Sequence, residues 1–202
     1  MPTATPSRQI RAAYDDDTIT VYQAYLPEIA DPALRAGTFV EPFSLTRMTW
    51  IKPSFLWMAY RSGWATKPGQ TRVLRIRITR EGFEWALTHS CLSHYDRKHH
   101  ASSEAWRTEL HQSPVRIQWD PEQTLHLQPQ PTARSIQIGL SGEAVPLYVN
   151  DWITSIEDLT DEMHTIQALT RTSPAEAASR LPTERPYPLP QLLTTHIAAS
   201  PT

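Results

Sequence analysis

The chain has 202 residues, enough for one sizeable domain, and its net charge of −2 at pH 7 excludes a uniformly basic coat for nucleic acid. Its one cysteine excludes a framework of internal disulfides and favours a reducing compartment. The N-terminal segment lacks the apolar run of a signal peptide, and no stretch is apolar for the eighteen residues that a membrane span needs. We therefore expect a soluble, cytoplasmic protein with no membrane partner.

The first half of the chain predicts alternating strands and helices. Residues 18–25, TITVYQAY, are rich in β-branched and aromatic residues and predict a strand. Residues 27–37 and 53–64 each begin at a proline and end near a glycine, which predicts two helices. The alternating segment 73–80, VLRIRITR, predicts the clearest strand of the chain. Short helices are expected over residues 81–92 and 102–112.

The second half predicts an antiparallel sheet followed by a helix and a tail. Three strands, VRIQW, TLHLQ and RSIQIGL, are expected with turns at DPEQ and around PQPTA, and these links are too short for helical crossovers. Helical material follows over residues 145–171, and six of the eighteen prolines fall after residue 172. The sequence predicts one α+β domain over residues 1–171, with a mostly antiparallel central sheet flanked by helices. Residues 172–202 are expected to form a proline-rich, largely irregular tail.

Charge is segregated along the chain. Residues 42–80, which we call the basic window, contain no acid and eight basic residues: Arg47, Lys52, Arg61, Lys67, Arg72, Arg75, Arg77 and Arg80. Within this window, tryptophans recur at positions 50, 57 and 64. Residues 151–162, the acidic segment, contain five acids and no base. Concentrated positive charge on one unit of structure indicates an anionic ligand, and aromatic rings beside cations suit nucleotides or single-stranded nucleic acid.

The basic window and two later strands supply the predicted substrate-binding residues. On the helix over 53–64, Arg61 either reaches the rim of a cavity or lies beside the tryptophans and caps the helix end. Arginines on the strand over 73–80 and glutamines on the later strands share one face if those strands are neighbours, and that face either meets solvent or floors a polar cleft. The predicted substrate-binding residues are Arg47, Trp50, Lys52, Tyr60, Arg61, Trp64, Arg75, Arg77, Gln118 and Gln137.

Candidates for catalysis and metal binding are fewer. Glu122 leaves the end of a polar-faced strand and is the candidate general acid or base, while its neighbour Asp120 is read as ordinary turn chemistry. The segment containing His89, Cys91, His94, His99 and His100 lacks a CxxC or HExxH spacing, so it predicts a solvated polar loop, and we assign no metal ligand. The six glycines form no phosphate-binding loop, which leaves side chains and helix ends to hold an anion.

Several phrases of the sequence resemble a known family. IRAAYDDDTITVYQAY, TRMTWIKPSFLWMAYRSGWATK, VRIQWDPE and RSIQIGLSG resemble the family catalogued as domain of unknown function 4291 over roughly residues 8–170. This resemblance implies one compact domain and no particular activity. VYQAY is also similar to the early strand of ADP-ribosyltransferase folds. That similarity implies NAD as cofactor, Tyr22 and Gln23 as cofactor-binding residues and Glu122 as the late glutamate, although these folds have His or Arg where Gln23 stands.

The sequence leaves three functions open. The first is an enzyme that acts on a nucleotide or nucleic-acid substrate, of the ADP-ribosyl-transferase type. The second is a non-catalytic module that binds RNA or a nucleotide. The third is a protein-interaction domain whose basic window docks an acidic partner or the chain's own acidic segment.

Overall fold

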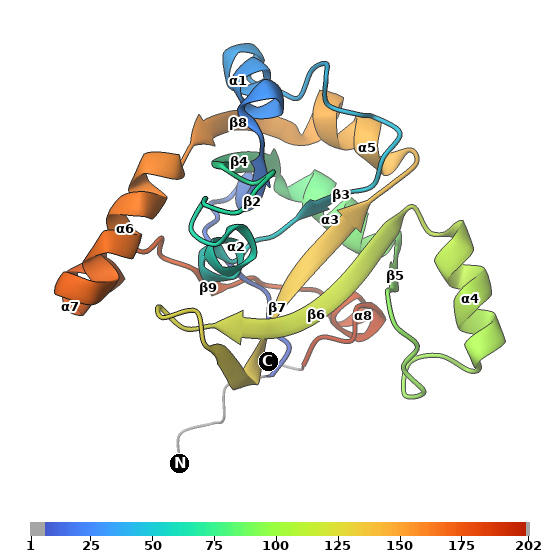
Figure 1. Cartoon of the computed structure of the whole chain (residues 1–202). Helices are drawn as coiled ribbons and strands as arrows, with labels where there is room; N and C mark the ends of the chain where they lie inside the picture. The colour runs from blue at the N-terminus through green and yellow to red at the C-terminus, as the bar shows by residue number, and fades with distance from the viewer. Residues whose placement is uncertain (1–6, 201–202) are drawn as a thin grey trace.

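Two β-sheets form the centre of the molecule in this computed structural model, which describes residues 7–200 (Figure 1). The first has the order β2-β4-β8, and the second has the order β3-β7-β6-β5. Each pairing in them is antiparallel except β5 with β6, which is parallel. The strands of the two sheets are β2 (Thr18–Tyr25), β3 (Thr49–Ile51), β4 (Arg72–Thr79), β5 (Ser90–Leu92), β6 (Val115–Gln123), β7 (Pro129–Leu140) and β8 (Ile153–Asp158). The predicted α+β fold with largely antiparallel pairing is confirmed, but the strands form two sheets where one was expected.

Helices pack around both sheets. They are α1 (Pro27–Ala36), α2 (Phe55–Ser62), α3 (Arg80–Thr88), α4 (Ser103–Gln112), α5 (Ala144–Leu147), the π-helical turn η1 (Tyr148–Trp152), α6 (Thr160–Thr172), α7 (Pro174–Ser179) and α8 (Gln191–His196). Over residues 7–200, none of them combines the length and the hydropathy that crossing a bilayer requires. In Figure 1, α4 and α6 lie at opposite sides of the molecule, with α2 between them.

Helix α2 has clear sequence signals at both ends. The Oγ atom of Ser54 accepts a hydrogen bond from the backbone N–H of Trp57 (3.1 Å), which satisfies one free donor of the first turn. Gly63 ends the helix in the left-handed conformation (φ 58°), where a side chain would be strained. These caps fix α2 over residues 55–62, inside the predicted range 53–64.

The two sheets meet where β2 passes the end of β3. The backbone N–H of Tyr22 donates to the carbonyl oxygen of Lys52 (2.8 Å), an isolated bridge between the two sheets. Trp50 lies against β7 at Gly139, where a Cβ atom would stand only 2.9 Å from the indole ring. Glycine therefore permits this close approach, which places Trp50 beside the junction of the sheets.

Several predicted boundaries are wrong. Residues 124–128, TLHLQ, form the turn between β6 and β7, whereas DPEQ and PQPTA lie inside those strands. Pro121 fits within β6 because the register shifts between Pro121 and Gln123, and such an irregularity tolerates a missing N–H. The expected helical material over 145–171 contains strand β8, and the expected helix over 81–92 ends at Thr88, before β5. These short strands become stable through pairing with β4 and β6, which a local pattern does not reveal.

The C-terminal segment lies against the body of the domain. It contains α7, α8 and the two-residue strand β9 (Arg185–Pro186), which pairs with β1 (Arg11–Ala12). Tyr187 is buried in the main hydrophobic core, where its ring meets Tyr14 and Phe83 edge-on. The segment thus adds aromatic area to the core.

Candidate anion-binding cavity

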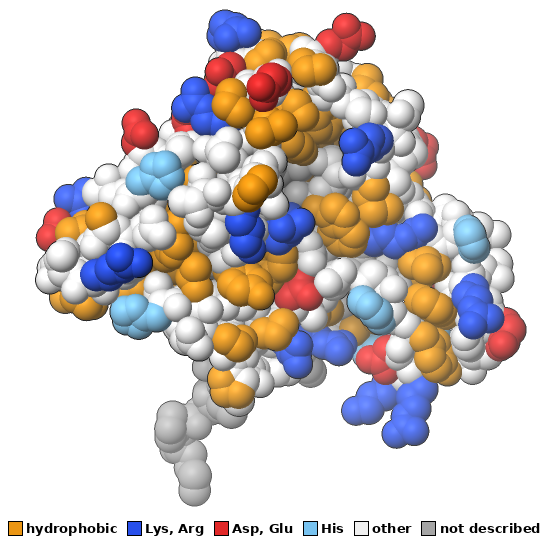
Figure 2. Space-filling view, in the orientation of Figure 1, with side chains coloured by type: hydrophobic (Ala, Val, Ile, Leu, Met, Phe, Trp, Pro, Cys, Tyr) orange, Lys and Arg blue, Asp and Glu red, His pale blue; other side chains and the backbone are white. Residues whose placement is uncertain are grey.

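A cavity of about 580 Å³ opens at the junction of the two sheets. Its wall combines the ends of β2 and β3, the middle of β6 and β7, the last turn of α2 and the loop that follows α2. Figure 2 shows Lys and Arg side chains beside a hollow near the middle of this face. Among the residues that line the cavity are Gln23, Arg47, Trp50, Lys52, Arg61, Gln118 and Gln137, all of them predicted from the sequence.

The three cations of the cavity have no acidic partner. Within residues 7–200, no carboxylate lies within salt-bridge distance of Arg47, Lys52 or Arg61. The side chains of Arg47 and Arg61 are exposed, whereas Lys52 is 6% exposed. The cavity therefore has two guanidinium groups that reach solvent and one buried ammonium.

Lys52 is an unusual lysine. Its Nζ donates to the carbonyl oxygen of Trp50 (3.2 Å) and lies 5.3 Å from the centre of the Trp57 ring. Burial, and after it the charge of Arg61, lower the pKa of Lys52 to about 7. The charge of Asp120 acts in the opposite direction. Lys52 therefore changes its charge near neutral pH, where an ordinary lysine stays protonated.

Arg61 is held in place by a neutral neighbour. The side-chain amide of Gln70, oriented so that both of its groups are satisfied, accepts from Arg61 Nη1 (2.9 Å) and donates to the backbone oxygen of Arg61 (3.2 Å). An amide positions a guanidinium group without neutralising its charge. This contact leaves Arg61 available for an anion.

Two glutamines provide polar groups on the second sheet. Gln118 on β6 and Gln137 on β7 stand opposite each other in the strand register. Both side-chain amides donate from Nε2 to the carboxylate of Asp120, Gln118 at 2.8 Å to Oδ1 and Gln137 to Oδ2. Among residues 7–200, neither side-chain carbonyl oxygen has a hydrogen-bond partner. Asp120 lies inside β6, where the sequence predicts a turn, and its carboxylate accepts from the amides of two glutamines that line the cavity.

Gln23 belongs to a tight hydrogen-bond network in the wall. Its Nε2 donates to Tyr25 Oη (2.9 Å) and to Thr49 Oγ1 (2.6 Å), and its Oε1 accepts from Tyr148 Oη (2.8 Å). Burial raises the pKa of Tyr25 to about 12, so this phenol stays neutral. The amide of Gln23 is therefore committed to the protein, and it makes the wall rigid.

Arg75 and Arg77 lie outside the cavity. Arg75 pairs with Glu157 (3.3 Å) and Glu162 (3.1 Å), and Arg77 pairs with Asp15. Their strand, β4, belongs to the first sheet, whereas the two glutamines belong to the second. The sequence predicts one sheet face that carries both these arginines and the glutamines if their strands are neighbours. Because the strands belong to different sheets, that shared face does not form.

Three aromatic residues of the predicted site also lie outside the lining. Tyr22 is fully buried, because side chains alternate along β2 and Gln23 takes the cavity side. Trp64 is 6% exposed and packs edge-on against Phe55, while Tyr60 is 45% exposed on α2. These rings support α2 or face solvent, and Trp50 is the predicted ring that lines the cavity.

Glu122 lies at the start of α2 and does not line the cavity. Its Oε1 accepts from Ser54 Oγ (2.9 Å) and from the backbone N–H of Gln123 (2.8 Å), and burial raises its pKa. The Oε1 of Glu184, from the C-terminal segment, accepts from the backbone N–H of Phe55 (2.7 Å). Burial, helped by the charge of Glu122, raises the pKa of Glu184 to about 8. The two carboxylates form a separate acidic group at the helix start.

Sequence reasoning missed other residues of the wall. Tyr25, Thr49 and Gln70 also line the cavity. Residues of these types are common in strands and turns, so their presence in the sequence does not indicate a binding site. Tyr25 was two positions beyond a residue that was identified, on the same face of its strand, and period-two spacing was a usable signal. Nothing local marks Gln70, because its role depends on the loop folding back over α2.

The fold and the site define a single-domain α+β protein with a cationic cavity between two sheets. The family model described as Domain of unknown function (DUF4291) matches residues 9–187, so the chain belongs to this family. No curated protein matches the chain.

Proposed function

We propose that this protein is an enzyme that acts on a nucleotide or a nucleic-acid end, whose phosphate enters the cavity. The observation that carries the proposal is the convergence of Arg47, Lys52 and Arg61 on one cavity with no carboxylate partner among residues 7–200. A buried cation without a partner is costly, and an anionic ligand would offset that cost. The volume of about 580 Å³ is within the range of about 300–1,000 Å³ that small-molecule sites occupy.

The lining residues suggest a division of roles. Arg47 and Arg61 would bind phosphate oxygens, because guanidinium groups match their geometry. Trp50 offers a flat ring for a base, and the free amide oxygens of Gln118 and Gln137 would accept hydrogen bonds from its edge. This arrangement favours a mononucleotide or dinucleotide over a long strand, since the cationic groups surround one cavity.

The enzymatic part of the proposal rests on Lys52. A buried lysine with a pKa of about 7 exchanges a proton under working conditions, and such perturbed groups concentrate at functional sites. Lys52 would act as the general base or electrostatic catalyst beside the bound phosphate. Because Glu122 does not line the cavity, the proposal gives it no catalytic role.

NAD is the first nucleotide to test. Gln23, one of the two residues that the ADP-ribosyltransferase resemblance implies for the cofactor, lies in the cavity wall, although its amide is bonded within the protein. A thermal-shift series with NAD, ADP-ribose, ATP, inorganic phosphate and a short RNA tests binding. A ligand at a hundred times its dissociation constant should stabilise the fold by about 2.7 kcal/mol, or about 5–10 °C for a chain of this size. The absence of any shift across the series would contradict the cavity's role.

Turnover separates the enzyme from a binding module. Chromatography of each nucleotide after incubation would reveal its consumption, and Lys52→Met should abolish that reaction while the protein still folds. A variant at an exposed residue outside the cavity, Tyr60→Phe, is the matched control. Binding without consumption of any nucleotide would favour the non-catalytic module.

A further inference from the structure

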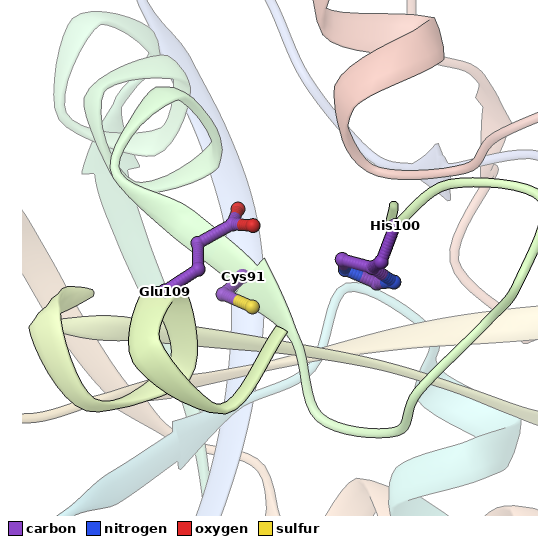
Figure 3. Close-up of side chains that lie close together, drawn as sticks. All are labelled: Cys91, His100 and Glu109. Atoms are coloured by element: carbon purple, nitrogen blue, oxygen red, sulfur yellow. The ribbon is translucent and has the colours of Figure 1, made fainter. Parts of the chain in front are cut away.

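A second cluster of reactive side chains lies at the far edge of the four-stranded sheet. Cys91 on β5, His100 on the loop after β5 and Glu109 on α4 each offer one ligand atom, and these atoms lie within 4.8 Å of one another. Figure 3 shows the thiol of Cys91 between the side chains of Glu109 and His100. We propose that these three residues bind a zinc ion that fastens α4 and the loop over residues 93–101 to the sheet.

The ligand set fits zinc by its chemistry. Thiolate, imidazole and carboxylate are the three ligand types that zinc uses in proteins, and the softness of the thiolate disfavours calcium and magnesium. Thiolate and carboxylate together would balance the two positive charges of the ion. Ligand atoms around a tetrahedral zinc stand about 3.5 Å apart, given bond lengths of about 2.0–2.3 Å. Side-chain movements of about 1 Å would therefore close the site, and the exposed Glu109 is the ligand with the most room to make them.

The surroundings already orient one ligand. Nδ1 of His100 lies 3.0 Å from the backbone oxygen of Asp96, to which it donates in the tautomer that carries hydrogen on Nδ1; in the other tautomer Nδ1 accepts from the backbone N–H of Asp96 at 3.3 Å. In the first of these tautomers Nε2 is the atom that binds metal, and a carbonyl partner of this kind is a common support of histidine ligands. The ring also faces Tyr95 and Trp106 at 6.0 and 6.5 Å between centres, which restricts its rotation.

A fourth position is available beside the cluster. His100 and Glu109 line a cavity of about 210 Å³ together with His99, Lys98 and His196, the last from α8. Zinc sites with three protein ligands complete their tetrahedron with a further side chain or with water. The cavity has room for a water molecule in this position.

The peripheral helix has a structural need for such a link. Helix α4 has no fully buried residue, and Trp106 on this helix donates from Nε1 to the backbone oxygen of Leu92 on β5 (2.8 Å). A helix with so little apolar burial gains little from packing. A zinc ion bound by both Glu109 and Cys91 would attach α4 to the sheet, which packing alone does only weakly. The sequence missed the site because its ligands are separated along the chain and only the fold adds Glu109.

Cobalt titration of the full-length protein tests the proposal. Cobalt(II) replaces zinc in such sites and gives a near-ultraviolet charge-transfer band when a thiolate binds it. Cys91 is the one cysteine in the sequence, so this band reports on that residue alone. We expect the band to saturate at one equivalent of cobalt, to disappear when zinc is added, and to coincide with a rise in Tm of about 5 °C or more.

Four variants locate the ion. Cys91→Ser should remove the band, and Glu109→Gln, an exposed change that does not threaten folding, should weaken cobalt binding at least about tenfold. His100→Ala should weaken it similarly. His164→Ala on α6, at the opposite side of the molecule in Figure 1, is the control and should bind like the wild type. A charge-transfer band that saturates well below one equivalent of cobalt would overturn the proposed site. A band that Glu109→Gln and His100→Ala leave unchanged would overturn it as well.

Discussion

The two halves of the basic window differ in whether their cations have acidic partners in the folded protein. In the first half, Arg47, Lys52 and Arg61 line a cavity and have no acidic partner among residues 7–200. In the second half, Arg72, Arg75, Arg77 and Arg80 on and after β4 each face a carboxylate. Three of these partners, Glu157, Asp158 and Glu162, belong to the acidic segment.

This difference shows what a run of like charge can mean. The second half meets the acidic segment because β8 pairs with β4, so that charges far apart along the chain face each other across two strands. The first half has no such strand beside it. Arg72 and Arg75 of β4 thus meet the chain's own acidic segment, whereas among residues 7–200 the cations of the cavity have no carboxylate within salt-bridge distance. An unpaired set of cations is the stronger indicator of a ligand.

The largest expected effect separates the two halves by ligand affinity. Arg61→Ala should weaken nucleotide binding about 10- to 100-fold, because a charge-assisted hydrogen bond contributes about 1.5–3 kcal/mol. Arg75→Ala, the matched change in the second half, should leave affinity unchanged. Calorimetric titration of both variants gives the comparison. Equal losses of affinity in the two variants would mean that the halves do not differ in function.

The next largest effect is the pH dependence of binding. The pKa of Lys52 is about 7, and an anion favours the protonated amine, so affinity should fall as pH rises above 7, by at most about tenfold per pH unit. NAD is a suitable probe because its phosphate diesters do not titrate in this range. Lys52→Met should bind more weakly at pH 6 and lose the pH dependence. A wild-type affinity that is flat between pH 6 and 9 would remove Lys52 from the ligand site.

The acidic group at the start of α2 gives a third test. The pKa of Glu184 is raised from 4.5 to about 8, so the folded state holds a proton that the unfolded state releases. The free energy of unfolding should fall as pH rises from about 4.5 to 8. Glu184→Gln should remove this slope and stabilise the protein at pH 8 by about 1–3 kcal/mol. Denaturant unfolding across pH measures this effect, and nucleotide affinity should stay unchanged; an altered affinity would place this carboxylate in the cavity.

The paired half of the window predicts a small effect on stability. The salt bridges of Arg75 are partly exposed, and pairs of that kind contribute about 1 kcal/mol or less. Arg75→Ala should therefore lower the free energy of unfolding by no more than that amount, while Arg47→Ala should leave it unchanged. Chemical denaturation of both variants makes the comparison. A larger loss in Arg47→Ala would give that residue a structural role.

The sequence predicts those residues of the cavity whose own type and spacing indicate anion binding. The interleaving of basic residues with tryptophans in the sequence indicates Arg47, Lys52 and Arg61, and the fold brings all three to one cavity. Arg75 and Arg77 carried the same local signal, but their acidic neighbours come from other segments. Electrostatic pairing across strands is set by topology, so composition alone cannot tell a paired arginine from a free one.

The fold was predictable to a similar degree and for similar reasons. Strand β2 and helices α1 and α2 follow strong local patterns and appear close to the expected positions. Strands β5 and β8 are short, and they exist because neighbouring strands hold them. The two sheets likewise meet at one isolated bridge, Tyr22 to Lys52, that no periodic pattern indicates.

The most direct test of the central claim is a crystal structure of the protein with the nucleotide that gives the largest thermal shift. The account predicts a phosphate within hydrogen-bonding distance of Arg47, Lys52 and Arg61, with the base over Trp50 and near Gln118 and Gln137. A phosphate bound to the arginines of β4, or a nucleotide outside the cavity, would contradict it.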